Sequence, residues 1–336
     1  MVIDSKFYMH LAIKEAWKYQ GLTYPNPAVG CCITGEHGEI LAINAHQKAG
    51  QPHAEVMALK DAYYKLTSDT KIVSLENSAD IHRYLIENHN NIFEKCSLYT
   101  TLEPCSHIGK TPSCASLIAT LKIQSVYVGS EDSNQEASCG NQILVRANVT
   151  VVNKTLEKQA KDLLEPFEKF RKENFVFFKW AQRMNGSVDD GVISSKESRE
   201  HVHAMRDVCD LLVVGGETVR KDRPTLDARL VNGKAPDVLI YSRRKDFDES
   251  IPLFSVANRE VFIEDSLSKL QEYKNIMIEG GEQMFRLTQD KVDYYLGYIA
   301  PKFGGSRASF LNLESEFEIL HSEEKSQDII LWMKRK

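Results

Sequence analysis

Hydrophobic positions in the N-terminal part of the chain alternate between helical and strand spacing. Residues 5–20 place apolar side chains such as Leu11 and Trp17 on one stripe of a helix, and Gly21 ends the run. Two apolar runs around a glycine-containing turn predict a β-hairpin. The predicted elements are helices at 5–20, 54–66 and 112–121, a hairpin at 28–34 and 39–44, and strands at 97–102 and 125–130. Strands that alternate with helices predict a layered α/β domain.

The pattern changes twice along the rest of the chain. Residues 67–95 are polar enough that we interpret them as a surface insertion. Residues 153–173 are rich in Lys and Glu, which predicts a charged helix that connects two domains. Beyond the connector, short apolar runs predict a mostly parallel, buried sheet. These runs are 175–181, 211–216, 237–242, 260–264, 275–281 and 294–301. We therefore expect two domains, 1–152 and 174–336.

Length, charge and cysteine content narrow the class of protein. A chain of 336 residues is long enough for two hydrophobic cores. The net charge of −5 argues against a surface that neutralises a nucleic-acid backbone. The N-terminus lacks the apolar core of a signal peptide, and no stretch reaches about 18 apolar residues, so we expect a cytoplasmic protein with no membrane partner. Seven cysteines without a secretion signal favour reduced thiols that are free to bind metal.

Three of the potential metal ligands form a set typical of zinc enzymes. His53 and Glu55 open a predicted helix, and Cys105 and Cys114 flank the start of another. Imidazole and thiolates suit zinc, and three protein ligands leave the fourth position open for water. Glu55 then provides a proton carrier beside the metal, as in zinc nucleobase deaminases. The alternative is a structural zinc site or simply buried cysteines, although a structural site usually has a fourth ligand and needs no glutamate.

The residues around this set carry a family resemblance. Thr23-Tyr-Pro-Asn-Pro-Ala-Val-Gly30, His53-Ala-Glu55 and Thr101-Leu-Glu-Pro-Cys-Ser-His-Ile-Gly-Lys-Thr-Pro-Ser-Cys114 closely resemble the bifunctional deaminase/reductase of riboflavin biosynthesis. The resemblance implies a cytidine-deaminase-like α/β/α domain followed by a dihydrofolate-reductase-like α/β domain. The first would deaminate 2,5-diamino-6-(5-phosphoribosylamino)pyrimidin-4-one, and the second would use NADPH to reduce the ribosyl group to ribityl.

The resemblance also implies roles for further residues of the deaminase domain. Asn26 would bind the pyrimidine, and His46, His107, Lys110 and Thr111 would line the pocket towards the phosphate-bearing part of the substrate. Each has a simpler alternative: Asn26 lies between two prolines and could only shape a turn, His46 could be a strand-end histidine with satisfied hydrogen bonds, and Lys110 could be a solvated surface charge.

In the second half, the order and spacing of Arg206, Thr218–Asp222, Pro224–Leu226, Arg229 and Glu279–Gly281 match the family's reductase pattern. The implied NADPH contacts are Ala181, Thr218, Asp222, Ser242 and Gly281. The implied substrate contacts are Arg206, Leu226, Arg229 and Glu279, and Lys179 corresponds to the family's lysine near the reacting sugar. Two arginines could grip a phosphate bidentately, and adjacent glycines let backbone N–H groups approach the cofactor's phosphates. A Gly-Gly pair alone is more often an ordinary turn, and Lys179 could be only a strand-edge lysine.

One segment departs from the family pattern. Family reductases carry Ser-Leu-Asp-Gly followed by a longer loop, whereas here Arg183-Met-Asn-Gly186 leads through residues 187–191 to Val192-Ile-Ser-Ser195. The missing residues would include a serine for the substrate and a tryptophan on the nicotinamide side. A second hypothesis is therefore a deaminase whose C-terminal domain has lost reductase activity. A third is a nucleic-acid-binding module with structural zinc, or a tRNA-editing deaminase. We expect a free small-molecule substrate, no nucleic-acid partner and a homo-oligomer.

Overall fold

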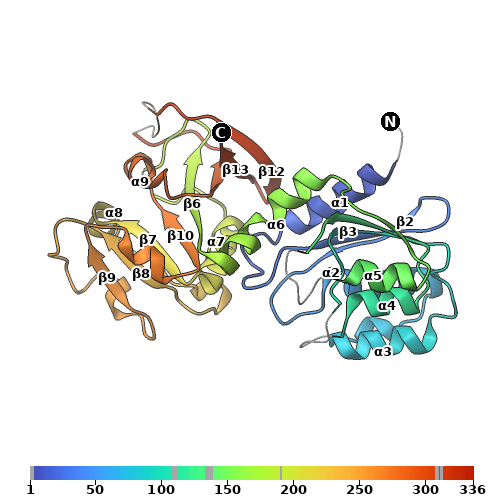
Figure 1. Cartoon of the computed structure of the whole chain (residues 1–336). Coiled ribbons are helices and arrows are strands. Elements are labelled where there is room, and N and C mark those ends of the chain that lie inside the picture. The colour runs from blue at the N-terminus through green and yellow to red at the C-terminus, as the bar shows by residue number, and fades with distance from the viewer. Residues whose placement is uncertain (1–3, 107–111, 133–138, 190, 307–309, 311–312) are drawn as a thin grey trace. The chain divides into compact units, whose positions relative to one another are not determined.

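The computed structural model describes residues 4–106, 112–132, 139–189, 191–306, 310 and 313–336. The chain divides into two compact units, Met1–Glu168 and Lys169–Lys336, each with a sheet of its own (Figure 1). No helix in the described part of the chain is both long and apolar enough to cross a membrane.

The first unit is built on a five-stranded sheet in the order β2-β1-β3-β4-β5. Strand β1 pairs antiparallel with β2 and β3, whereas β3, β4 and β5 are parallel. The predicted hairpin, strands and helices of this domain are confirmed. The elements are α1 (Ser5–Trp17), β1 (Gly30–Thr34), β2 (Ile40–Ala45), α2 (Ala54–Thr67), η1 (Ile72–Ser74), α3 (Ser78–Asn88), β3 (Ser97–Leu102), α4 (Cys114–Thr120), β4 (Ser125–Ser130), α5 (Gly140–Arg146) and β5 (Thr150–Val152).

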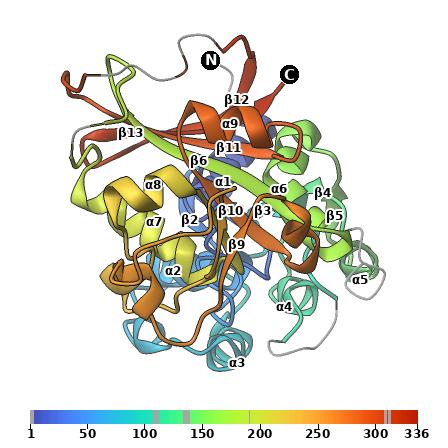
Figure 2. The same cartoon turned by 90° about the vertical axis from the view of Figure 1, so that its left-hand side faces the viewer.

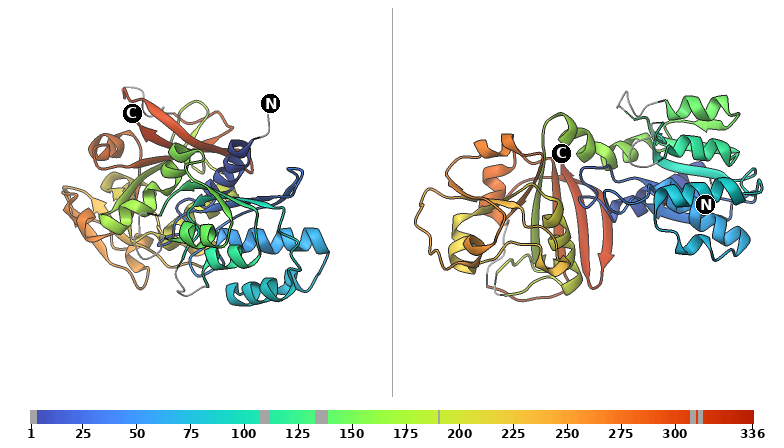
Figure 3. Two further views of the ribbon diagram at one scale, coloured as in Figure 1. Left: turned by 45° about the vertical axis from the view of Figure 1, so that its right-hand side comes forward. Right: turned by 90° about the horizontal axis from the view of Figure 1, so that it is seen from below.

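Helices cover both faces of this sheet (Figure 3). Helix α1 begins at its N-cap Asp4, whose side chain accepts hydrogen bonds from the backbone N–H groups of Lys6 and Phe7. It packs across β1, β2 and β3. The approach is so close that a Cβ atom on Gly30 would lie 1.9 Å from the Ala12 carbonyl oxygen, so only glycine fits there. Helices α2, α4 and α5 lie on the opposite face, where α2 contacts β1 and β2.

The polar stretch 67–95 is more than a surface insertion, which corrects our interpretation. The stretch contains α3, which packs against α2 and α4. Four apolar residues of the stretch are fully buried, namely Ile72, Ile81, Leu85 and Phe93. Ile81 and Leu85 are one helical turn apart and form a narrow inward stripe. The many polar residues between them concealed that stripe in the sequence.

The second unit has an eight-stranded sheet in the order β12-β13-β11-β6-β10-β7-β8-β9. The six neighbouring strands β11, β6, β10, β7, β8 and β9 are parallel, as predicted. Strands β13 and β12 add an antiparallel hairpin next to β11. That hairpin was not predicted, because β12 is mostly polar and half-exposed and has no apolar run. The elements are α6 (Glu157–Lys172, begun in the first unit), β6 (Phe175–Arg183), α7 (Lys196–Val208), β7 (Leu211–Gly215), α8 (Gly216–Asp222), η2 (Arg229–Val231), β8 (Asp237–Tyr241), η3 (Pro252–Ser255), β9 (Val261–Glu264), η4 (Ser268–Glu272), β10 (Asn275–Glu279), α9 (Glu282–Thr288), β11 (Tyr294–Ala300), β12 (Phe317–Lys325) and β13 (Asp328–Arg335).

Helices also lie on both faces of the second sheet (Figure 2). On one face, Phe285 of α9 packs edge-on against Phe178 of β6 and contacts Tyr295 of β11. On the other face, His201 of α7 contacts Tyr298 of β11. Residues 295 and 298 are an odd number of positions apart on one strand, so their side chains point to opposite faces. This double coverage explains why the parallel strands are continuous apolar runs.

Candidate active sites

The three predicted metal ligands come together in the first unit. His53 is the N-cap of α2, Cys114 is the first residue of α4, and Cys105 follows β3. The His53 Nδ1 atom lies 3.7 Å from Cys105 Sγ and 3.4 Å from Cys114 Sγ, and the three ligand atoms all lie within 4.8 Å of one another. A tetrahedral zinc ion with ordinary Zn–N and Zn–S bond lengths separates such atoms by about 3.6 Å. The geometry therefore fits zinc, with three ligands supplied by the described residues.

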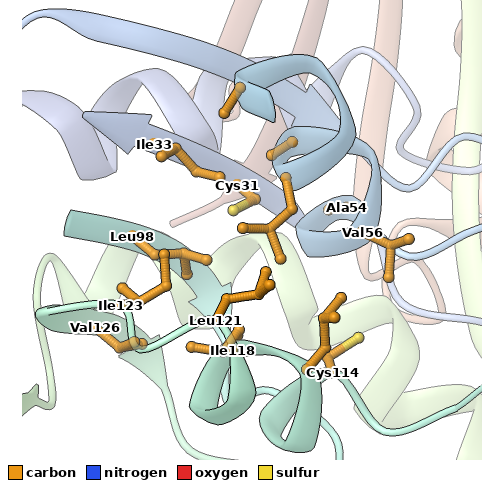
Figure 4. Close-up of a cluster of buried hydrophobic side chains, with 14 of the residues drawn as sticks. Cys31, Ile33, Ala54, Val56, Leu98, Cys114, Ile118, Leu121, Ile123 and Val126 are labelled. Carbon is orange, nitrogen blue, oxygen red and sulfur yellow. The ribbon is translucent and has the colours of Figure 1, made fainter. Parts of the chain in front are cut away.

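The surroundings of the thiols also suit a metal site. The Cys114 backbone N–H points to Cys105 Sγ at 3.4 Å. Hydrogen bonding with Cys114 lowers the pKa of the Cys105 thiol, against the opposing effect of burial. Figure 4 shows Cys114 beside Ala54 and Ile118 among the apolar side chains of the core. A ligand set held by packed elements keeps its geometry before the metal arrives.

Glu55 lies in the first turn of α2, two residues after His53, and is almost fully buried. Burial raises the pKa of its carboxyl group to about 7, while the charge of His53 opposes the shift. A carboxyl group with a pKa near neutrality can both accept and donate a proton at physiological pH. The structure therefore places a proton carrier beside the three ligands.

Asn26 and His46 form a pair next to the ligand set. The Asn26 Nδ2 atom lies 3.1 Å from His46 Nε2, and His46 Nδ1 lies 3.2 Å from the Pro52 carbonyl oxygen. Burial lowers the pKa of His46 to about 4, so its ring is neutral, with one nitrogen donating to Pro52 and the other accepting from Asn26. The His46 ring meets the His53 ring edge-on at 5.7 Å between centroids. This pairing directs the Asn26 amide nitrogen to His46 and leaves its oxygen for another donor.

Sequence reasoning missed two buried polar residues near this site. Glu103, within the motif that carries Cys105, accepts hydrogen bonds from the backbone N–H groups of Asp132 and Asn141. Its place in that motif could have suggested it. His82 of α3 is buried, and its Nε2 atom has no hydrogen-bond partner in the described structure. No sequence signal marks His82. The predicted pocket residues His107, Lys110 and Thr111 lie outside the described residues.

The second unit contains a cavity of about 1490 Å³ at the carboxyl ends of β6, β7, β8 and β10. Open α/β sheets commonly bind ligands at this edge. Nine of the ten residues implied for the reductase line the cavity: Lys179, Ala181, Arg206, Thr218, Asp222, Leu226, Ser242, Glu279 and Gly281. The tenth, Arg229, is not among the lining residues. Its exposed side chain pairs with Asp227 at 2.8 Å.

A buried group of charges forms the floor of this cavity. Arg206 binds Glu279 through both Nε and Nη2, at 2.8 to 3.0 Å, and Lys179 Nζ lies 3.7 Å from Glu279 Oε2. Burial alone would raise the pKa of Glu279, but Arg206 and Lys179 lower it to about 2. Burial lowers the pKa of Lys179, and Glu279 opposes that shift.

The structure gives Arg206 a partner that the sequence did not indicate. Its donors bind Glu279 and the Asp227 carbonyl oxygen, so Arg206 fixes the Glu279 carboxylate. The sequence could not show the pairing of Arg206 with Glu279, because the two residues lie 73 positions apart. A phosphate contact by Arg206 and Arg229 stays a prediction.

Two turns that line the cavity contain adjacent glycines, which let the backbone approach a ligand closely because they have no Cβ atom. Gly215 ends β7 and Gly216 follows it, and Gly280 and Gly281 follow β10. A Cβ atom on Gly280 would lie 2.6 Å from the Met284 Cβ atom, which packs the turn against α9. The cavity and its glycine turns are therefore suited to a dinucleotide.

Comparison with known proteins agrees with this two-site arrangement. Residues 3–130 match the cytidine and deoxycytidylate deaminase zinc-binding region, and residues 181–331 match the RibD C-terminal domain. The class is thus a zinc-binding deaminase domain joined to a reductase domain with a dihydrofolate-reductase-like fold, as predicted.

Relatives with both domains specify the family. The riboflavin biosynthesis protein RibD of Aquifex aeolicus is 30% identical and covers 98% of each chain, and that of Corynebacterium ammoniagenes is 30% identical over 90% of this chain and 88% of its own. The crystal structure of a diaminohydroxyphosphoribosylaminopyrimidine deaminase/5-amino-6-(5-phosphoribosylamino)uracil reductase from Thermotoga maritima is 25% identical, with a TM-score of 0.64 over 99% of both chains. The chain belongs to the RibD family of riboflavin biosynthesis proteins, which confirms the predicted resemblance.

Proposed function

We propose that this chain catalyses two consecutive steps of riboflavin biosynthesis. The first is hydrolytic deamination of 2,5-diamino-6-(5-phosphoribosylamino)pyrimidin-4-one, and the second is NADPH-dependent reduction of the ribosyl group to ribityl. The observation that carries the first step is the cluster of His53, Cys105 and Cys114 beside the buried Glu55. We assign residues 1–152 to the deaminase domain, 153–173 to the connector and 174–336 to the reductase domain.

In the deaminase domain, His53, Cys105 and Cys114 would hold zinc. Bound zinc supplies the Lewis acidity that activates water near neutral pH. Glu55 takes a proton from the attacking water and delivers it to the leaving amino nitrogen, for which a pKa of about 7 is well matched. Asn26, oriented by His46, accepts a hydrogen bond from the pyrimidine through its amide oxygen. His107, Lys110 and Thr111 extend this pocket towards the phosphate.

In the reductase domain, the reduction adds a hydride from NADPH and a proton to the sugar. Lys179 is the proton donor, because burial lowers its pKa and makes the ammonium group a stronger acid. Glu279, fixed by Arg206, holds the Lys179 ammonium group in place. Ala181, Thr218, Asp222, Ser242 and Gly281 would hold the cofactor, and Arg206, Leu226, Glu279 and, at the exposed rim, Arg229 would contact the substrate.

The proposal is tested by supplying the purified, zinc-loaded chain with the diaminopyrimidine ribotide and NADPH. We expect ammonia release followed by oxidation of one NADPH per ammonia. Glu55→Gln should lower the rate of ammonia release by about 10²-fold to 10⁴-fold, since it removes the proton carrier, while bound zinc stays unchanged. The same variant should still oxidise NADPH when it is given the deaminated pyrimidine.

Glu87→Gln is the matched control, because Glu87 is exposed on α3. It should leave both rates unchanged. If Glu55→Gln also loses zinc, Glu55 is a ligand or a structural residue instead of a proton carrier. If the wild-type chain releases ammonia but neither binds nor oxidises NADPH, the deaminase-only hypothesis replaces the bifunctional one.

Three expectations about the surroundings of the chain stay predictions. We expect a homo-oligomer, which light scattering of the purified protein tests directly. We also expect a cytoplasmic location and no nucleic-acid partner, because the net charge is −5 and the substrate is a free nucleotide-like molecule. Salt-sensitive RNA binding by the purified chain would contradict the last of these.

A further inference from the structure

Arg183 lies at the end of β6 and begins the segment that departs from the family pattern. Its side chain is buried, and its Nη1 atom donates to Ser187 Oγ at 3.1 Å and to the Asp189 carbonyl oxygen at 2.5 Å. Its backbone N–H donates to the Ser187 carbonyl oxygen at 2.9 Å. One arginine therefore folds residues 183–189 into a tight turn.

A second segment, residues 302–306 after β11, supports this turn from the other side. The Gly304 carbonyl oxygen accepts from Asn185 Nδ2 at 2.9 Å and from Ser187 Oγ at 2.5 Å. The backbone N–H and hydroxyl groups of Ser306 donate to the two carboxylate oxygens of Asp189, at 3.2 and 2.7 Å. Between them, Gly305 has a φ of +79°, and a Cβ atom there would lie 2.5 Å from Ser187 Oγ. The two segments fit together only with glycine at this position.

The turn forms one wall of the reductase cavity. Val188, Asp189 and Gly191 line the cavity together with Lys179 and Ala181 of β6. The side-chain oxygens and the carbonyl oxygen of Asp189 are engaged by Ser306 and Arg183, so the residue is fixed from two directions. Val188, next to it, also lines the cavity and presents an apolar side chain.

We propose that Arg183 is a positioning residue of the reductase, which holds Val188 and Asp189 as a preformed wall against the bound ligands. This inference rests on the proposed reductase function. A segment with no helix or strand of its own would otherwise lose conformational freedom each time a ligand binds, which weakens binding. Arg183 and the 302–306 segment order the wall in advance, so ligand affinity, and not the chemical step, depends on them.

The test compares Arg183→Ala and Arg183→Lys with the wild-type full-length chain. For Arg183→Ala we expect KM values for NADPH and the deaminated pyrimidine to rise by about 10-fold to 100-fold, the effect of ordering one or two residues on binding. We expect kcat to change little. Arg183→Lys keeps one cationic donor, so its KM values should lie between those of the wild-type chain and those of Arg183→Ala. NADPH dissociation constants from fluorescence titration should rise in parallel with KM.

Gly305→Ala tests the same wall from the opposite segment and should also raise KM. Met184→Ala is the matched control, because Met184 adjoins Arg183 but is exposed and does not line the cavity. Thermal unfolding of the same samples reports whether the second unit of each variant is folded, and Gly305→Ala decides the test if Arg183→Ala does not fold. A fall in kcat with unchanged KM and NADPH affinity in the variants would overturn the inference. Absence of NADPH oxidation by the wild-type chain would instead contradict the proposed function.

Discussion

The two candidate sites are built in different ways. In the first unit, two helix N-termini and the loop after β3 bring three ligand atoms within 4.8 Å of one another. In the second unit, the carboxyl ends of four parallel strands surround a cavity of about 1490 Å³. A metal site is defined by a few residue types at short range, whereas a dinucleotide site is defined by the topology of the sheet.

The buried glutamates of the two sites differ just as clearly. Glu55 has a pKa raised to about 7 by burial, and Glu279, whose side chain is 15% exposed, has a pKa lowered to about 2 by Arg206 and Lys179 in spite of burial. The first carboxyl group is placed to exchange a proton, and the second to remain a fixed negative charge. The same side chain thus serves opposite purposes, according to the cations around it.

The largest expected effect comes from breaking the metal site alone. Removal of zinc with a chelator, or the substitution Cys105→Ser, should abolish ammonia release, because the ligand set loses the ion that activates water. NADPH oxidation with the deaminated pyrimidine should continue, since the residues that line the reductase cavity all lie in the second unit. Metal analysis and the two separate assays measure this.

Cys139→Ser is the matched control for the thiol substitution. Cys139 is exposed and lies outside the ligand set, so zinc content and both activities should stay at wild-type levels. A parallel loss of reductase activity on zinc removal would show that the two sites are not independent, and would contradict the comparison drawn above.

The same contrast explains how much the sequence could predict. His53, Glu55, Cys105 and Cys114 could be recognised because each lies in a short motif and zinc restricts the residue types. The parallel strands of the second unit could be recognised as apolar runs, because both faces of the sheet are covered.

Features that depend on distant residues could not be predicted. The pairing of Arg206 with Glu279, and of Asp189 with Ser306, joins residues on different segments with no shared motif. Helix α3 was missed because its apolar positions are sparse among polar ones, and the hairpin β12–β13 was missed because β12 is mostly polar, although β13 contains an apolar run at residues 329–333. Periodicity detects elements with a wide apolar face and fails for those with a narrow one.

A medium effect is expected from Glu279→Gln. The change leaves Arg206 and Lys179 buried without their counter-charge, which should lower the free energy of unfolding of the second unit by about 3 to 5 kcal/mol. The pKa of the Glu279 carboxyl group is about 2 in the folded state, below the value of about 4.3 in the unfolded state. In the wild-type chain, Glu279 therefore stabilises the second unit above pH 4.3, and this stabilisation is lost as the pH falls towards 2. Urea unfolding at several pH values measures both effects.

Glu272→Gln provides the comparison for that substitution. Glu272 pairs with Lys269 at 2.8 Å on the surface, so its loss should change stability by less than about 1 kcal/mol. Equal destabilisation by the two substitutions would mean that the Glu279 cluster behaves as an ordinary surface ion pair.

The smallest effect at neutral pH concerns His201 of α7. Its Nδ1 atom lies 2.9 Å from the Tyr298 hydroxyl oxygen, and burial, followed by Lys325, lowers its pKa to about 3, while Glu323 opposes the shift. The folded state therefore keeps His201 neutral at pH values where an exposed imidazole, with a pKa of about 6.5, is protonated. Since the unfolded chain then binds more protons, stability should fall as the pH decreases from 6.5 towards 3, by up to about 1.4 kcal/mol per pH unit.

His201→Asn isolates this contribution, because asparagine can keep a hydrogen bond to Tyr298 but does not titrate. We expect a flatter pH dependence of stability in the variant, measured as hydrogen-exchange protection of β6 and β11 amides after correction for the intrinsic exchange rate. His10→Asn removes an exposed histidine on α1 and should leave the wild-type slope intact. If the His201→Asn and wild-type curves run parallel below pH 6.5, His201 is not the group responsible. A flatter curve would show that the acid sensitivity of the second unit arises partly from one buried neutral imidazole, in addition to the Glu279 cluster.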